Sequence, residues 1–343
     1  MPSIARSDLD AMVEQTEELW RCLSGARVFM TGATGFFGVW LLSSFAHARE
    51  RLGLKIPLTL LTRDSRAVRA KHGALIDAAG AELISGDVRS YAFPEGSFSH
   101  VIHGATAASA ALNADNPAEM FDVIASGTRR ALEHARAAGC TRFLLMSSGA
   151  VYGPQPSGLR NVPESHGGGP PTLDLASAYG EGKRAAEHLS AIYAHASPFG
   201  LTVARGFAFV GPYLPLDTHF AIGNFLRDAL AGKPIRILGD GTPYRSYMYG
   251  TDLATWMWTL LVKGRAGAAY NVGSDDGRPL GEVAARVAAA TGVEVQIAQQ
   301  AKSGDPPKRY VPDTSLARTE LGLRLRVDLD EGIRRTLAFH RST

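Results

Sequence analysis

Short apolar runs alternate with longer amphipathic stretches from residue 26 onward, and this alternation constrains the fold more than any other feature. Strands that alternate with helices in this way form a parallel sheet covered by helices on both faces. The chain is therefore predicted to be an α/β protein with a doubly wound parallel sheet. The expected strands are 27–31, 57–62, 81–85, 100–103, 142–148 and 201–207. The expected helices between them are 36–50, 65–79, 117–138 and 176–196.

The same pattern divides the chain into three parts. Residues 1–24 are acidic and amphipathic, and we expect a helical extension, capped by Ser7, that packs without chemistry. Residues 25–206 hold the strand and helix alternation. After about residue 206 the alternation loosens, and Gly/Pro turns separate shorter segments. Residues 207–343 should form a smaller α/β lobe, partly interwoven with the first domain, that closes over a ligand at the strand ends.

Composition argues against several classes of protein. The chain is 45% hydrophobic and 20% charged, and its net charge of +3 comes from both signs spread along it, so nucleic acid is not an expected partner. No apolar run approaches the roughly 20 residues of a membrane span, and the N-terminus lacks a signal-peptide pattern. Cys22 and Cys140 lack metal-ligand spacing, so each is expected to be a buried, reduced thiol. We expect a cytoplasmic protein without a metal or a membrane partner.

A glycine-rich turn, TGATGFFG at 31–38, follows the first strand and precedes a helical pattern. Glycines at this place let the chain turn tightly and let the backbone approach a pyrophosphate, which then faces the N–H groups of the helix N-terminus. Spaced glycines alone could make only a structural turn, but their position after the first strand favours dinucleotide binding. The expected contacts are Gly32, Thr34, Gly35, Phe36, Phe37 and Gly38.

Tyr179 and Lys183 lie four residues apart in SAYGEGK, so one helical turn places both side chains on the same side. A nearby ammonium stabilises a phenolate and lowers the tyrosine pKa from about 10, which makes the phenol a usable proton shuttle. Ser148 ends the fifth strand, at the edge where doubly wound folds do chemistry. The alternatives are an ordinary amphipathic helix with an exposed tyrosine and lysine, and Ser147 as the working hydroxyl.

The spacing G-x-x-G-x-x-G, together with Ser148, Tyr179 and Lys183, resembles the extended branch of the short-chain dehydrogenase/reductase superfamily. The resemblance covers most of the chain from residue 26 onward. It implies a Rossmann domain that binds NAD or NADP. It also implies roles: Tyr179 as the acid/base, Lys183 as its tuner and a ligand of the nicotinamide ribose, and Ser148 as the hydroxyl that orients the substrate.

The resemblance implies further coenzyme contacts at other strand ends. Asp87 and Val88 match the family's contact to the adenine ring, although Asp87 could be a plain turn aspartate. NAD-using relatives usually place an acid where this chain has Thr62, followed by Arg63, so NADP is favoured over NAD. The remaining expected contacts are His103, Gly104, Ala105 and Phe207.

The C-terminal half resembles nucleotide-sugar-modifying members of this branch. Arg245, in GDGTPYRS, matches the arginine that usually holds the substrate diphosphate, a task that suits a planar guanidinium. Arg309 is a second candidate, or else a surface arginine. Ser148, Gly149 and Tyr179 complete the expected substrate contacts. Asp252 is expected to cap the following helix rather than touch substrate.

One departure from the family pattern narrows the reaction. Dehydratases of this branch carry an acid pair directly after the hydroxyl residue, but this chain has Gly149 and Ala150, and neither side chain can move a proton. Water elimination by that route is therefore not expected.

The expected reaction is redox 4-epimerisation of a nucleoside-diphosphate hexose by transient hydride transfer at C4. NADPH-dependent reduction of a 4-keto-6-deoxy sugar is the alternative. A non-catalytic dinucleotide-sensing scaffold would retain the fold without the reaction, but the presence of serine, tyrosine and lysine together argues against it. Relatives commonly dimerise through two helices per subunit, so the resemblance also implies a homodimer through 117–138 and 176–196.

Overall fold

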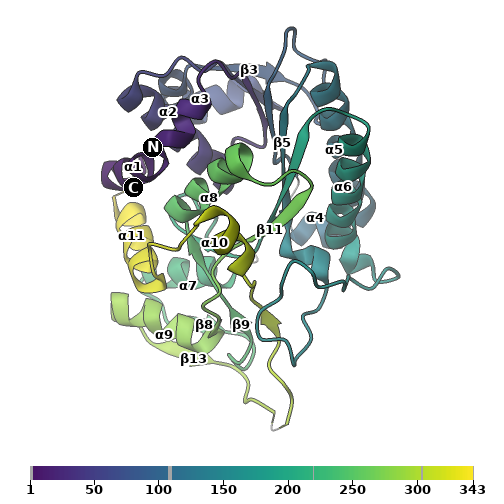
Figure 1. The fold of residues 1–343 in the computed structure, drawn as a ribbon. Coiled ribbons are helices and arrows are strands. Elements are labelled where there is room, and N and C mark those ends of the chain that lie inside the picture. The colour runs from purple at the N-terminus through teal and green to yellow at the C-terminus, as the bar shows by residue number, and fades with distance from the viewer. Residues whose placement is uncertain (1–2, 107–109, 219, 303, 343) are drawn as a thin grey trace.

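The computed structural model describes residues 3–106, 110–218, 220–302 and 304–342 (Figure 1). Within them a seven-stranded parallel sheet, in the order β11-β6-β5-β4-β1-β2-β3, forms the centre of the molecule. Its strands are β1 Val28–Thr31, β2 Leu58–Thr62, β3 Ala81–Ser85, β4 His100–His103, β5 Arg142–Ser148, β6 Gly200–Gly206 and β11 Ala268–Val272. The predicted doubly wound α/β fold is confirmed.

Helices cover both faces of this sheet (Figure 1). One layer consists of α5 Pro117–Ala137 and α6 Ala178–His195, preceded by the short α4 Ala110–Asp115. The other layer consists of α2 Phe36–Leu52, α3 Ser65–Ala79 and α8 Gly250–Lys263, with α1 Arg6–Cys22 packed outside it. Asn116 caps α5 as predicted, because its side chain accepts from the Glu119 N–H at 3.2 Å.

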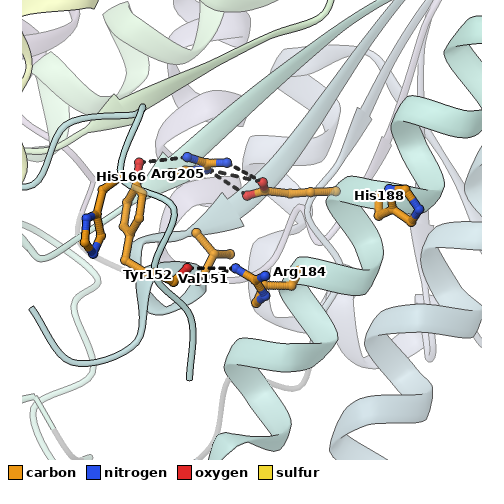
Figure 2. A pocket seen from close by; sticks show the side chains of 8 residues that line it. Val151, Tyr152, His166, Arg184, His188 and Arg205 are labelled. Carbon is orange, nitrogen blue, oxygen red and sulfur yellow. Dashed lines mark hydrogen bonds and ion pairs between the residues drawn. The ribbon is translucent and has the colours of Figure 1, made fainter. Parts of the chain in front are cut away.

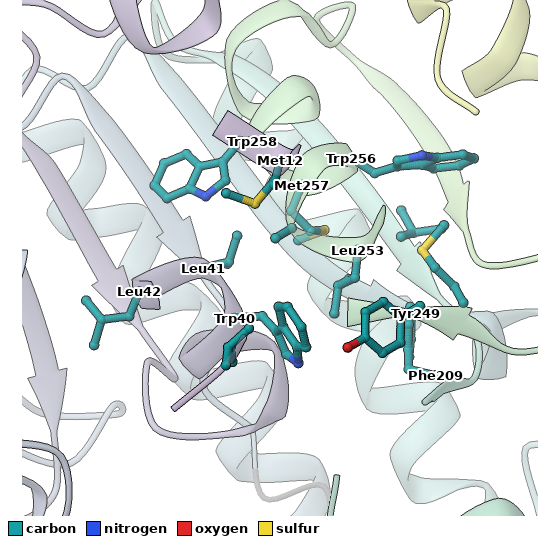
Figure 3. Close-up of a cluster of buried hydrophobic side chains, with 14 of the residues drawn as sticks. Met12, Trp40, Leu41, Leu42, Phe209, Tyr249, Leu253, Trp256, Met257 and Trp258 are labelled. Atoms are coloured by element: carbon teal, nitrogen blue, oxygen red, sulfur yellow. The ribbon is translucent and has the colours of Figure 1, made fainter. Parts of the chain in front are cut away.

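Alternate residues of the strands supply two separate cores. In β1, Phe29 belongs to the cluster under α5 and α6, whereas Val28 and Met30 belong to the larger cluster under α2 and α8. Successive strand residues point to opposite faces, so a sheet covered on both sides needs apolar residues at nearly every position. Figure 3 shows part of the larger cluster, where Trp40 of α2 and Trp258 of α8 lie among leucines and methionines.

The sequence reading missed the seventh strand. β11 pairs with β6 in parallel register, and α8 packs on β5 and β6 just before it, so residues 250–272 return to the central sheet. The two lobes are therefore interwoven in sequence. The division of the chain into two domains at residue 206 stays a prediction.

Short strands and helices of the C-terminal half form the smaller lobe. Three small sheets, β10-β7, β12-β9-β14 and β13-β8, lie within its described residues. The strands are β7 Phe209–Val210, β8 Ile235–Ile237, β9 Tyr244–Arg245, β10 Met248–Tyr249, β12 Arg278–Pro279, β13 Val295–Ile297 and β14 Arg309–Tyr310. The helices are α7 Ala221–Leu230, α9 Leu280–Thr291, α10 Ser315–Leu321 and α11 Leu329–Arg341.

The N-terminal helix α1 lies beside the C-terminal helix α11, so the two ends of the chain are close together (Figure 1). Ala5, and not the predicted Ser7, occupies the N-cap position of α1. The carboxylate of Asp8 is buried and accepts hydrogen bonds from the Tyr249 hydroxyl at 2.7 Å and from Arg335 of α11. The partly buried ion pair and the tyrosine hydrogen bond tie α1 to α11 and β10.

Cys22 and Cys140 are both free thiols, but their surroundings differ. Cys140 is buried as predicted, whereas Cys22 is exposed, because it ends α1 on the side opposite the buried Trp20. No described helix is long and apolar enough to cross a membrane. Within the same residues, no group of three or more His, Cys, Asp or Glu side chains could hold a metal ion. Location in the cytoplasm stays a prediction.

The predicted cap at Asp252 is wrong. α8 begins at Gly250, and Asp252 lies inside its first turn with 3% of its surface exposed. Its carboxylate accepts from the N–H groups of Arg326 at 3.0 Å and Val327 at 3.2 Å, so it anchors the segment that leads into α11. Burial raises the pKa of Asp252 to about 6.

Replacing Asp252 by alanine should lower the free energy of unfolding by about 2 kcal/mol, because two backbone N–H groups lose their buried, charged acceptor. Asp252→Asn retains an acceptor and should remain within about 1 kcal/mol of the parent at pH 7.5. An acid with a raised folded-state pKa gains stability as it protonates, so the parent should gain on Asp252→Asn as the pH falls from 6 towards 4. Urea unfolding at pH 7.5 and 4.5 measures both effects. Equal stability of the alanine variant would contradict the anchoring role.

Candidate active site

The glycine-rich turn between β1 and α2 packs backbone against backbone. Gly32 has φ +78°, and a Cβ on it would lie 2.5 Å from the carbonyl carbon of Gly104, at the end of β4. A Cβ on Gly38 would lie 2.3 Å from backbone atoms of Ala33 and Gly32. Both positions therefore exclude any other residue, which places the start of α2 directly over the end of β1.

The N-terminus of α2 is suited to an anion. Gly35 is its N-cap residue, and within the described chain no side chain caps it and no acid lies in its first turn. The nearest atom to a Cβ at Gly35 would be the Gly32 carbonyl oxygen at 3.9 Å, so the space in front of this N-terminus is open. Thr34 is exposed, and the rings of Phe36 and Phe37 pack on Phe209. These features fit the pyrophosphate of a dinucleotide.

At the end of β2 the chain presents an arginine, and not an acid that could bind the hydroxyls of a ribose. Thr62 ends the strand, and Arg63 is exposed. The next residue, Asp64, is occupied as the cap of α3, because its carboxylate accepts from the N–H groups of Arg66 and Ala67 at 2.9 and 3.0 Å. A 2′-phosphate would therefore meet Arg63 and no free carboxylate from this turn.

Asp87, beyond β3, is engaged by an arginine. Its carboxylate accepts from Arg89 Nε and a terminal nitrogen, each at 2.9 Å, and these bonds lower its pKa to about 2. Val88 is buried against Gly127 of α5, where a Cβ would lie 2.8 Å from the valine methyl. An adenine contact of Asp87 stays a prediction, and it would share the carboxylate with Arg89.

A buried histidine lies at the end of β4. His103 Nδ1 lies 2.8 Å from Thr31 Oγ1 and its Nε2 lies 3.1 Å from Thr128 Oγ1, so the ring cross-links β1 and α5. Burial lowers its pKa to about 3, which keeps it neutral. The side chain is therefore structural, and only the backbone at 103–105 can face a coenzyme. The Ala105 N–H donates to Thr31 Oγ1 at 3.0 Å and shapes this turn.

Ser148, Tyr179 and Lys183 meet at the carboxyl end of β5. Ser148 lies close enough to the Tyr179 phenol to act to lower its pKa. The Lys183 ammonium lies 5.9 Å from the centroid of the Tyr179 ring and donates to the Met146 carbonyl at 2.9 Å. The predicted trio is thus brought together. Asn113 of α4, which sequence reading missed, accepts from the Tyr179 N–H at 2.9 Å and holds the start of α6.

The expected electrostatic effect of Lys183 on Tyr179 is not what the structure shows. Burial raises the pKa of the Tyr179 phenol, and the neighbouring Ser148 hydroxyl acts to lower it. Lys183 directs its ammonium to the Met146 carbonyl instead, and burial lowers its own pKa to about 8. The interior of the protein disfavours both charges, and this desolvation outweighs their attraction across the ring. The serine is therefore the closer tuner of the phenol.

A polar network further along α6 was also missed. Glu187, one turn after Lys183, accepts from Ser147 Oγ at 2.5 Å and from Arg205 at 2.7 Å. Arg205 donates to the Tyr152 hydroxyl at 2.8 Å, as Figure 2 shows. Ser147 is thus occupied away from Tyr179, which supports Ser148 as the working hydroxyl. A cavity of about 380 Å³ borders this network, lined by Val151, Tyr152, His166, Gly168, Arg184, Glu187, His188 and Arg205.

The two arginines that could bind the substrate diphosphate lie on opposite faces of a small sheet in the C-terminal lobe. Arg245 of β9 is the register partner of Tyr310 of β14, and its guanidinium lies 5.8 Å from that ring. Arg309 is the partner of Tyr244 and lies 3.9 Å over its ring. Neighbouring strand residues point to opposite faces, so Arg245 shares a face with Tyr310 and Arg309 lies on the other. Arg245 is the better-placed candidate for a ligand held at Ser148.

Two aromatic residues close the site over Gly149. A Cβ at Gly149 would lie 2.7 Å from the Phe207 ring and 2.8 Å from the Tyr310 hydroxyl. The two rings pack at an interplanar angle of 38° with centroids 4.7 Å apart, and Ser148 lies close enough to the Tyr310 hydroxyl to act against the burial that raises its pKa. Sequence reading singled out Phe207 and Gly149 but missed Tyr310, although the residue beside it, Arg309, was named.

Comparisons with known proteins agree with this geometry. The model of the NAD-dependent epimerase/dehydratase family matches residues 28–273, from β1 to just past β11. UDP-glucuronic acid decarboxylase 6 of Arabidopsis thaliana is 28% identical over 90% of this chain and 87% of its own length.

Solved structures are similar over nearly the whole chain. MoeE5 in complex with UDP-glucuronic acid and NAD has a TM-score of 0.75 at 26% identity, and the match covers 92% of this chain and 99% of that one. DesIV, a dTDP-glucose 4,6-dehydratase from Streptomyces venezuelae with NAD and TYD bound, has a TM-score of 0.79 at 23% identity, covering 92% and 97%.

Proposed function

The chain belongs to the NAD-dependent epimerase/dehydratase family, and we propose from this membership that it is an enzyme that moves hydride at C4 of a nucleoside-diphosphate sugar. The observation that carries the proposal is the meeting of Ser148, Tyr179 and Lys183 at the end of β5. A bound nicotinamide would supply the hydride acceptor and donor. Tyr179 takes the proton of the sugar hydroxyl and later returns it, and Ser148 hydrogen-bonds the same oxygen.

Redox 4-epimerisation is the reaction we place first. It needs one proton shuttle at one carbon, and the site offers Tyr179 with hydroxyls around it. Gly149 and Ala150 supply no acid, and Phe207 and Tyr310 fill the space beside Gly149, so elimination of water by an acid pair has no support. Reduction of a 4-keto sugar needs the same groups and remains the alternative.

Oxidative decarboxylation of a nucleotide-linked uronic acid is a second candidate, favoured by the names of the relatives. After oxidation at C4, the bond from C5 to the carboxylate can break, because the ketone accepts the electron pair as carbon dioxide leaves. Protonation at C5 then precedes hydride return to C4. This route, like epimerisation, needs no acid pair at 149 and 150.

For the coenzyme, NADP is proposed ahead of NAD. The exposed Arg63 and the engagement of Asp64 as a helix cap support this order. For the substrate, Arg245 is proposed to hold the diphosphate. Arg309 stays a weaker candidate because it lies on the other face of its sheet.

A panel of nucleotide sugars tests the function. Purified protein, with NAD and NADP supplied in turn, is incubated with uridine, thymidine, guanosine and cytidine diphosphate sugars, including UDP-glucuronic acid and a 4-keto sugar. Interconversion of two C4 epimers supports the first proposal, loss of NADPH absorbance the reductase, and released carbon dioxide the decarboxylase. If none of these products forms with any member of the panel, the enzymatic proposal is wrong.

A homodimer through α5 and α6 is also proposed. The two helices pack side by side, and each exposes a large apolar side chain: Phe121 is 41% exposed and Ile192 is 50% exposed. Sedimentation of the parent should give a dimer, and Phe121→Asp with Ile192→Asp should give a monomer. A monomeric parent at micromolar concentration would rule the interface out.

A further inference from the structure

The side-chain amide of Asn113 bridges two backbone groups at the start of α6. Its Oδ1 accepts from the Tyr179 N–H at 2.9 Å, and its Nδ2 donates to the Ala176 carbonyl at 2.9 Å. Asn113 belongs to α4, so the contact joins two elements although Asn113 and Tyr179 lie 66 residues apart in the chain. Tyr179, the proposed acid/base, is thus held through its own backbone by a neighbouring helix.

The start of α6 needs a partner of this kind. Tyr179 is the second residue of α6, and the N–H groups of a helix's first turn have no carbonyl acceptor within the helix. A side chain at the N-cap position usually accepts from one of them. In the part of the chain that the structure describes, Ser177 holds this position without a capping hydrogen bond. Asn113 supplies the missing acceptor from outside the helix.

An asparagine is suited to both contacts at once. A backbone N–H only donates and a carbonyl only accepts, so the two partners fix which end of the amide faces which group. An aspartate could accept from the Tyr179 N–H but could not donate to the Ala176 carbonyl, and an alanine could do neither. The two bonds reach both sides of Ser177, and together they restrain the first turn of α6 against fraying and rotation.

The first turn of α6 lies against the end of β5. A Cβ on Gly180 would be 2.9 Å from the carbonyl oxygen of Ala150, two residues beyond the strand. The next turn has an anchor of its own, because Lys183 donates to the Met146 carbonyl of β5 at 2.9 Å. Loss of the Asn113 amide should therefore release the turn that carries Tyr179 and leave Lys183 in place.

We propose that Asn113 is a positioning residue for Tyr179: it fixes the first turn of α6 so that the phenol is held at the carboxyl end of β5. The inference rests on the proposed function, in which Tyr179 exchanges a proton with the substrate. A displacement of about 1 Å can lower the rate of a positioned group about 100-fold. A cap on the backbone of Tyr179 can therefore govern turnover although its bonds are to main-chain atoms.

Asn113→Ala tests the proposal because it removes both hydrogen bonds. The kcat should fall about tenfold, since an unrestrained turn holds the phenol in the reactive place only part of the time. The KM for the coenzyme should stay within about twofold, because Lys183 keeps its bond to β5. Asn113→Asp keeps an acceptor for the Tyr179 N–H and should restore kcat to within about threefold of the parent. A parental kcat in Asn113→Ala would contradict the proposal.

Asn116→Ala is the matched control. Asn116 caps α5 by accepting from the Glu119 N–H at 3.2 Å, so this substitution removes an asparagine cap of the same kind from the adjacent helix. Both alanine variants should lose a similar amount of thermal stability, but only Asn113→Ala should lose turnover. An equal loss of kcat in Asn116→Ala would show that lost stability explains the effect and would rule out the positioning role.

The amide exchange of Tyr179 separates this proposal from the function. With ¹⁵N-labelled tyrosine, the Tyr179 N–H signal is identified by its loss in Tyr179→Phe. Its exchange with deuterium should be about tenfold faster in Asn113→Ala, and close to the parental rate in Asn113→Asp and Asn116→Ala. Unchanged exchange in Asn113→Ala would overturn the proposal whatever the activity. Faster exchange without turnover of any sugar would overturn the function alone.

Asn113→Leu is a second variant if Asn113→Ala does not fold. Leucine has a similar volume but forms neither hydrogen bond, so kcat should fall and Tyr179 exchange should accelerate in the same way. Thermal unfolding establishes that each variant is folded before exchange is measured. Parental Tyr179 exchange in a folded Asn113→Leu variant would also count against the proposal.

Discussion

Tyr179→Phe should lower kcat about 10³-fold, which is the range expected for removal of a general acid/base. The ring is retained, so the contacts of α6 should survive, but the site loses the phenol that lies beside Ser148. Lys183 cannot replace it, because its ammonium is bound to the Met146 carbonyl. The measurement is steady-state turnover of whichever sugar the panel identifies.

Coenzyme affinity distinguishes lost chemistry from a lost site. The dissociation constant of the reduced coenzyme, followed by its fluorescence, should remain within about threefold in Tyr179→Phe. Tyr193→Phe is the matched control on the same helix, where the ring lies under Arg136 and away from Ser148. It should keep full turnover. If Tyr179→Phe retained more than a tenth of the parental kcat, the acid/base role would be lost.

Gly38→Ala and Gly35→Ala should separate folding from coenzyme binding. At Gly38 a Cβ would lie 2.3 Å from rigid backbone, so alanine forces α2 away from β1 and should cost about 3 kcal/mol of unfolding free energy. At Gly35 the added methyl meets open space and the backbone has ordinary negative φ. This variant should keep the parental stability within about 1 kcal/mol.

For coenzyme binding the order should be the opposite, with the specific effect in Gly35→Ala. The methyl of Gly35→Ala projects into the space in front of the α2 N-terminus, where the pyrophosphate is proposed to lie, so the coenzyme dissociation constant should rise at least tenfold. Fluorescence titration measures it, and urea unfolding measures stability on the same samples. Unchanged affinity in Gly35→Ala would mean that the dinucleotide does not use this turn.

Most strands of the central sheet could be predicted closely because each one is a short apolar run in the sequence. β4 and β5 begin and end where their apolar runs do, since strands buried on both faces leave almost no polar interruptions. β11 escaped notice because its run follows a helix of the second half, where the alternation had already loosened. Its place depends on pairing with β6, a contact between distant parts of the chain.

The site was predictable where a motif carries its own geometry. Tyr179 and Lys183 share a helix face by spacing alone, and Gly32 and Gly38 reflect contacts that forbid a side chain. Asp252 shows the limit of such reading: a carboxylate near a helix start suggests a cap, yet its partners are N–H groups at 326 and 327. Tyr310 shows the same limit, because nothing near it in sequence indicates that its hydroxyl lies beside Gly149.

The amino-acid sequence alone determined the α/β fold, the glycine turn and the residues that can exchange a proton, because each depends on spacing within one or two neighbouring elements. Only the tertiary structure decided how those residues are tuned. Burial opposes the charge of Tyr179 and of Lys183, and the neighbouring Ser148 acts on the Tyr179 pKa in the direction first assigned to the lysine. Desolvation and the direction of a hydroxyl proton arise from packing between distant segments, and local sequence does not encode either one.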